Sequence, residues 1–162
     1  MIEKNLKSIR EFKAAGSHGP LTARVIECLE IMESVVNRPK QPVITETAWA
    51  PLAAIVDVEN FERIGNYGEE VKWPEYRNLL VMWANHGWWR SRIWRIWEVP
   101  GFAFLEGVER SSTTGPVSDK GGYHALNSFC VFEFNPRNKI RNLYVYDQRP
   151  LEGSPAGPLI EA

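Results

Sequence analysis

At 162 residues, the chain is long enough to bury the hydrophobic core of one domain, and its 44% hydrophobic and 24% charged content is that of a globular protein. The net charge of −1, with no long run of basic residues, argues against a nucleic-acid partner. No apolar run approaches the roughly 20 residues that span a bilayer, and the N-terminus lacks the apolar core of a secretory signal. The two cysteines lie far apart and form no metal-ligand cluster. We therefore expect a cytoplasmic protein with no membrane partner and no metal.

The first half of the chain predicts helices that are interrupted by glycine and proline. A short charged segment ends at Gly16, a helix stop signal, and Pro20 opens a longer helix whose apolar residues recur at helical spacing. Pro74 must lie in the first turn of the last of these helices. The predicted elements are helices at 2–14, 20–37, 45–54 and 69–85 and a strand at 56–64.

The stretch 88–148 predicts four consecutive strands. Its runs are rich in aromatic and β-branched residues, which suit a half-buried pleated surface. The breaks at 100–101, 114–122 and 135–138 carry the glycine, proline and asparagine of turns. Short links favour antiparallel pairing, because parallel pairing needs a long crossover.

This order of elements predicts an α+β fold, a cone-shaped, curved antiparallel sheet that is covered on one face by the N-terminal helices. Such a bent sheet encloses a conical cavity. We expect a single domain at 1–150 and a tail at 151–162 that is rich in proline and glycine.

The same order, together with the phrase FCVFEFNPRNKIRNLYVYD at 129–147, resembles the nuclear-transport-factor-2-like or SnoaL-like superfamily. This group includes limonene-epoxide hydrolase, ketosteroid isomerase and polyketide cyclases. The resemblance covers roughly 20–148 and implies the conical fold, while one such scaffold carries many different reactions.

The closest spacing is with limonene-epoxide hydrolase. On this resemblance, Asn60 takes the place of the family's water-holding Asn, and Glu109 takes the place of one catalytic Asp. The chain departs from the family elsewhere, with Val58 in place of a Tyr, Gly107 in place of the Arg and Val145 in place of the second Asp.

Glu109 is the strongest candidate for acid/base chemistry. A carboxyl group in an apolar cone has a raised pKa and can exchange protons near neutral pH. The alternative is a salt bridge to Arg90, Arg92 or Arg95 on the adjacent strand. Asp147 is the candidate partner carboxylate, and its alternative is a strand-end residue that caps a turn.

Two further polar residues complete the predicted catalytic set. Asn60 could hold a water molecule or a carbonyl oxygen, or only satisfy the backbone of a turn. His124 could shuttle protons, since imidazole titrates in the useful range, or lie idle beside a glycine-rich loop. Strand alternation and the helix pattern predict the residues that contact the substrate, which are Val58, Glu62, Trp83, Leu105, Ser128, Cys130, Phe132 and Val145.

Two functions fit these residues. The first is a small cofactor-independent enzyme, a cyclase, dehydratase, isomerase or hydrolase, that acts by acid/base catalysis on an apolar oxygenated metabolite such as a polyketide or terpenoid. The second is a non-catalytic module of the same fold that binds a small apolar molecule or serves assembly. In both cases we expect a homodimer through the outer sheet face, where Glu106 and Arg110 would point.

Overall fold

The computed structural model of the protein describes residues 5–117 and 126–148. His124, the predicted tail at 151–162 and the start of the first predicted helix lie outside these ranges. A seven-stranded sheet has the order β1-β4-β5-β6-β7-β2-β3. Its strands are β1 Lys7–Ser8, β2 Glu62–Ile64, β3 Glu70–Lys72, β4 Trp88–Val99, β5 Phe102–Ser112, β6 Leu126–Phe134 and β7 Ile140–Gln148.

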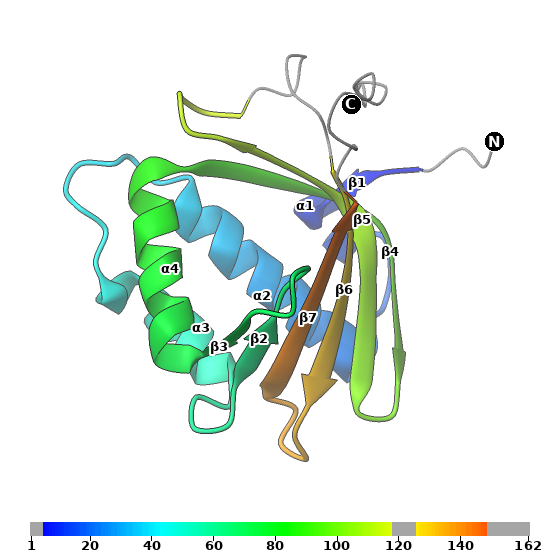
Figure 1. Cartoon of the computed structure of the whole chain (residues 1–162). Helices are drawn as coiled ribbons and strands as arrows, with labels where there is room; N and C mark the ends of the chain where they lie inside the picture. The colour runs from blue at the N-terminus through cyan, green and yellow to red at the C-terminus, as the bar shows by residue number, and fades with distance from the viewer. Residues whose placement is uncertain (1–4, 118–125, 149–162) are drawn as a thin grey trace.

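Helices cover one face of this sheet, which confirms the predicted α+β layers. Figure 1 shows α2 and α4 against the concave side of the curled strands, and the opposite side of β5, β6 and β7 has no helix on it. The helices are α1 Ile9–Ala14, α2 Pro20–Val36, the 3-10 helix η1 Glu46–Trp49, α3 Ala50–Ile55 and α4 Trp73–His86. In the part of the chain that the structure describes, no helix has both the length and the apolar character needed to cross a membrane.

The four long strands form the predicted antiparallel meander, but the sheet as a whole is mixed. Strand β2 pairs in parallel with β7, with Arg63 opposite Leu143. No short hairpin joins these two strands, so the direction of β2 is not fixed by a turn.

Three predicted boundaries were wrong, each because a local contact competes with the longer element. The first helix begins at Ile9, because Ser8 and Glu11 form a reciprocal capping box, and residues 7–8 pair with β4. The strand predicted at 56–64 is reduced to β2, because 57–60 form a turn in which the Asn60 N–H donates to the Asp57 carbonyl at 3.0 Å. Residues 70–72 pair with β2 as a strand, so α4 starts only at Trp73.

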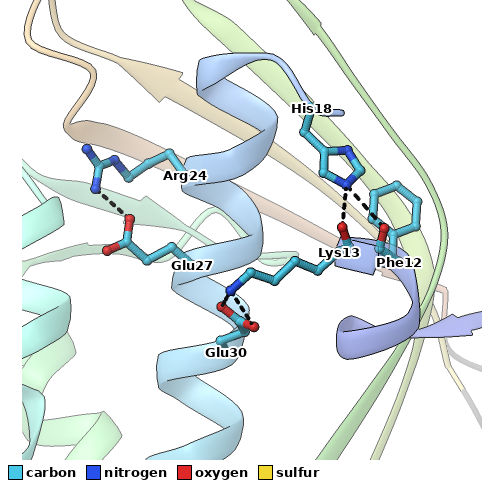
Figure 2. A network of polar contacts seen from close by, with 6 residues as sticks. All are labelled: Phe12, Lys13, His18, Arg24, Glu27 and Glu30. Atoms are coloured by element: carbon cyan, nitrogen blue, oxygen red, sulfur yellow. Dashed lines mark hydrogen bonds and ion pairs between the residues drawn. The ribbon is translucent and has the colours of Figure 1, made fainter. Parts of the chain in front are cut away.

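Polar side chains fix α1 on the outside of α2. Figure 2 shows Lys13 of α1 reaching Glu30 of α2, with Nζ–Oε distances of 3.0 and 2.8 Å. His18 places Nε2 3.1 Å from the carbonyl of Phe12 and stacks on the same residue's ring, with centroids 5.4 Å apart. His18 thus binds a carbonyl in the last turn of α1 and packs on the ring beside it, so it has a structural role.

Candidate functional site

A pocket of about 630 Å³ lies between α2, α4 and the inner face of the sheet. Its size is in the range of small-molecule sites. Most of its lining is apolar, and two carboxyl groups and one guanidinium group interrupt it. The lining residues are Cys28, Leu29, Met32, Arg63, Tyr76, Leu79, Leu80, Met82, Trp83, Leu105, Glu109, Cys130, Phe132, Leu143, Val145 and Asp147.

Strand register separates apolar from polar rows inside the pocket. Leu105, Cys130 and Val145 lie opposite one another on β5, β6 and β7 and form an apolar row. One step along the same face, Asp147 lies opposite Ser128, and Glu109 follows at the next step on β5. The carboxyl groups therefore share one end of the pocket wall, and the other end is apolar.

Glu109 is held in an environment that favours its protonated form. Burial raises the pKa of Glu109 to about 7, and the charge of Asp147 adds to this rise. Hydrogen bonds from Trp89 and Ser128 and the positive charge of Arg63 oppose it. Because its pKa lies near neutrality, Glu109 can both donate and accept a proton at physiological pH.

Asp147 has one buried carboxyl oxygen, Oδ1, that none of the described residues hydrogen-bonds. The backbone of Asp147 is fixed by the side chain of Asn66, whose Oδ1 accepts from the Asp147 N–H at 2.8 Å and whose Nδ2 donates to its carbonyl at 3.4 Å. A buried carboxylate oxygen with a free lone pair is suited to accept a proton or a hydrogen bond from a ligand.

Arg63 was not predicted as a site residue, although it is the one basic side chain in the lining. It comes from β2, and its Nη1 lies 3.4 Å from Oε1 of Glu69, while its guanidinium carbon lies 6.0 Å from the ring centre of Tyr76. The predicted strand placed Val58, Asn60 and Glu62 inward. With 57–60 in a turn, the alternate residue Arg63 faces the pocket instead.

The two thiols and the phenol in the pocket remain protonated at physiological pH. Burial raises the pKa of Cys28 to about 12, and it raises the pKa of Cys130 and of Tyr76 still further. Buried thiols of this kind are small apolar groups rather than nucleophiles. In the described part of the chain, no three His, Cys, Asp or Glu side chains are grouped so that they could hold a metal ion.

The structure brings together most of the predicted site residues and removes others from the pocket. Those that line it are Glu109, Asp147, Trp83, Leu105, Cys130, Phe132 and Val145. Ser128 is buried behind the lining, with its Oγ 3.6 Å from the Cys130 sulfur, and it hydrogen-bonds to Glu109. Val58, Asn60 and Glu62 do not line the pocket, because of the turn at 57–60, and the Asn60 amide donates to Asp57 at 3.2 Å.

The alternative for Glu109, an ion pair with a strand arginine, is not seen in the ion pairs of Arg92 and Arg95. Arg95 pairs with Glu106 at 2.7 Å on the opposite face, and Arg92 lies 3.6 Å from Glu11. The partner of the Glu109 carboxylate is the indole of Trp89, at 3.1 Å. Trp89 lies diagonally opposite Glu109 on the adjacent strand, and this relation could not be predicted without the strand register.

Gly107 explains one departure from the epoxide-hydrolase pattern. A Cβ atom at this position would lie 2.4 Å from the backbone oxygen of Arg92, closer than real Cβ contacts come. The register of β4 shifts between Ile93 and Arg95, just where Gly107 pairs. An arginine side chain therefore cannot project from position 107 unless the neighbouring strand moves.

Comparison with known proteins finds similarity in structure only. No family model matches the chain, and no curated protein matches its sequence. A SnoaL-like polyketide cyclase from Agrobacterium tumefaciens superposes with a TM-score of 0.58 at 15% identity, over 82% of this chain and 94% of that one. An LEH-like epoxide hydrolase of M. tuberculosis gives a TM-score of 0.53 at 12% identity, over 75% and 83%. A nuclear-transport-factor-2-like protein of unknown function from Exiguobacterium gives 0.59 at 10% identity, over 78% and 99%. At these identities the likeness concerns the fold alone.

Proposed function

The chain has the nuclear-transport-factor-2-like fold, and we propose that its pocket is the active site of a small cofactor-independent enzyme. The substrate is an apolar oxygenated metabolite, of the polyketide or terpenoid kind, and the reaction proceeds by acid/base catalysis. One observation carries this proposal: Glu109 and Asp147 line the same apolar pocket, and their surroundings differ.

The two carboxyl groups have complementary roles. Asp147, with its unpartnered buried oxygen, is the base that takes a proton from the substrate or from a water molecule. Glu109, whose pKa is raised to about 7, is the acid that protonates the oxygen on which charge develops. The cycle closes in one of two ways: Asp147 gives its proton to the product as Glu109 takes its own back, or the product keeps the proton from Glu109 and the proton on Asp147 passes to Glu109. Pairs of carboxyl groups in unlike environments divide acid and base roles in this way.

Two proteins of similar structure support this reaction class, since one is a SnoaL-like polyketide cyclase and the other an LEH-like epoxide hydrolase. The likeness does not select between cyclase, dehydratase, isomerase and hydrolase. The obstruction at Gly107 weighs against the arginine-dependent arrangement of the epoxide hydrolases.

A thermal-shift screen tests the proposal. Wild type, Glu109→Gln and Asp147→Asn are screened against apolar ketones, epoxides and polycyclic phenols, with Glu62→Gln as a control because Glu62 does not line the pocket. A ligand that binds only the folded state raises the melting temperature by mass action. We expect a ligand class that stabilises the wild type and the control, with an altered response in the two pocket variants, and turnover of that class by the wild type and the control only.

The alternative function is a non-catalytic binding or assembly module, and the outer face of the sheet offers a surface for assembly. Trp97, Phe104, Phe129 and Tyr146 form a row of rings across β4, β5, β6 and β7, with centroid distances of 5.3 to 6.4 Å. Tyr146 is 51% exposed. We propose that this face mediates a homodimer, which is compatible with either function. Ligand binding without turnover of any member of the panel would favour the binding module.

A further inference from the structure

The hairpin of β2 and β3 supplies both the cation of the pocket and the clamp on one of its carboxyl groups. Arg63 lies on β2, and Asn66 in the turn binds both backbone groups of Asp147. Neither residue belongs to the carboxyl pair proposed to move protons. The hairpin therefore provides the positive charge that shares the pocket with Asp147 and Glu109, and it fixes the backbone of Asp147.

The guanidinium group of Arg63 is only partly used by the protein. Its ion pair within the described residues, to Glu69, is long at 3.4 Å, and the Glu69 side chain is 43% exposed. The Glu69 carboxylate also accepts the Tyr67 N–H at 2.9 Å, so it divides its capacity between two donors. Exposed ion pairs of this geometry contribute little, and a guanidinium group has five N–H donors in a fixed fork.

A protonated Glu109 makes the pocket more receptive to an acidic oxygen. In this form the described lining carries Arg63 as its positive group against Asp147, whereas an ionised Glu109 would add a second negative charge. The Glu69 carboxylate already shows that an acidic oxygen can approach the guanidinium from the protein side. A ligand oxygen of the same chemistry would meet Arg63 in surroundings that contain much less water, where a charge-assisted hydrogen bond is stronger.

We propose that Arg63 binds an acidic oxygen of the ligand, so that the pocket selects an amphipathic weak acid, a carboxylic acid or an enol, over its neutral analogue. The apolar body of this ligand lies on the row of Leu105, Cys130 and Val145. Glu69 competes for the same guanidinium group from outside. This inference rests on the pocket being the functional site, and it adds the chemical class of the ligand.

A matched pair of probes tests the inference. The affinities of 1-naphthaleneacetate and of its neutral isostere 1-naphthaleneacetamide are measured by calorimetry at pH 6, where Glu109 is mostly protonated. We expect the acid to bind wild type about tenfold more tightly than the amide, the factor of one charge-assisted hydrogen bond. Arg63→Gln should abolish this preference and weaken binding of the acid much more than binding of the amide, and Arg63→Lys should retain part of the preference.

Two further variants separate binding from folding. Arg77→Gln is the control, because Arg77 also pairs with a glutamate, Glu46 at 2.8 Å, but does not line the pocket. Glu69→Gln should strengthen binding of the acid, because it frees the guanidinium group. Equal affinity of the wild type for acid and amide, or an equal loss of affinity for both in Arg63→Gln, would overturn the role of Arg63. The pocket would still be a ligand site in either case. Binding of neither probe would overturn the pocket itself and the inference with it.

Discussion

Trp89 donates its indole N–H to the carboxylate of Glu109, with 3.1 Å between Nε1 and Oε2. The register of β4 and β5 pairs Ser91 with Glu109 and Trp89 with Ser111, so the two bonded residues are diagonal neighbours on the inner face. The Trp89 ring is fully buried and packs edge-on against Trp83, with centroids 5.7 Å apart. A rigid indole thus orients the carboxyl group that we propose to move protons.

The free energy of unfolding should depend on pH through Glu109. Its folded pKa of about 7 lies above the ordinary value of 4.5, so between these values the folded state binds more protons than the unfolded state. The contribution of Glu109 is complete below pH 4.5 and is lost as the pH rises through 7, by an amount on the order of 3 kcal/mol.

Glu109→Gln should remove this loss and be more stable than wild type at pH 8. Urea unfolding at pH 5 and pH 8 measures both proteins, and an identical pH dependence in the two would contradict the assignment.

Replacement of Trp89 should shift the titration of Glu109. The indole hydrogen bond favours the charged carboxylate, so Trp89→Phe should raise the pKa of Glu109 further. Carbon-13 NMR of the glutamate carboxyl groups reports this pKa directly. Trp83→Phe is the matched control, since it alters the same aromatic contact without touching the carboxylate. A similar pKa in wild type and Trp89→Phe would mean that the hydrogen bond does not form in solution.

The long strands could be predicted from the sequence because their signals are local and repeated. Alternation along 102–112 placed Leu105 and Glu109 on one face, and the structure agrees. The short strands could not be predicted, because β2 and β3 have three residues each and depend on pairing partners far away in the chain. A one-residue error in such a strand reverses its faces, which is how Arg63 was missed and Asn60 was wrongly placed inward.

Contacts that join distant segments through side chains had no signal in the sequence either. Asn66 binds the backbone of Asp147. Asn37 binds the backbone of Trp89, donating to its carbonyl at 2.7 Å and accepting from its N–H at 2.9 Å. Each amide offers one donor and one acceptor to a strand, as a neighbouring strand would. Asparagine in a loop usually indicates a turn, so its pairing with a remote strand appears only in three dimensions.

Lys40 should be a structural residue whose loss destabilises the fold. Its ammonium group donates to the carbonyls of Val36, Ala84 and Gly87 at 2.5, 2.8 and 2.6 Å, and so joins the C-terminal ends of α2 and α4. The carbonyls of Val36 and Ala84 lie in the last turns of their helices, where they lack helical partners, and a cation at this end also suits the helix dipole. We expect Lys40→Met to lower the free energy of unfolding by about 2 kcal/mol.

The control for Lys40 is Lys13→Met, which removes an exposed ion pair to Glu30. Exposed pairs contribute roughly 0–1 kcal/mol, so this variant should be nearly as stable as wild type. Urea unfolding of both variants makes the comparison. A loss in Lys13→Met as large as that in Lys40→Met would show that the hydrogen bonds of Lys40 to the three carbonyls carry no special weight.

The outer sheet face should hold the homodimer together. Trp97 is 37% exposed and Tyr146 51% exposed, so the aromatic row offers an apolar surface that water covers in a monomer. Charged replacements there, Trp97→Lys with Tyr146→Lys, should convert the dimer to a monomer, because two copies would bring like charges together on an apolar face.

Light scattering after size exclusion measures the mass of the wild type and of the double variant. Val43→Lys is the matched control, since Val43 is 64% exposed in the segment between α2 and η1, on the helix side of the sheet. A wild-type mass of one chain would refute the dimer. A dimer that survives the double replacement would place its interface elsewhere.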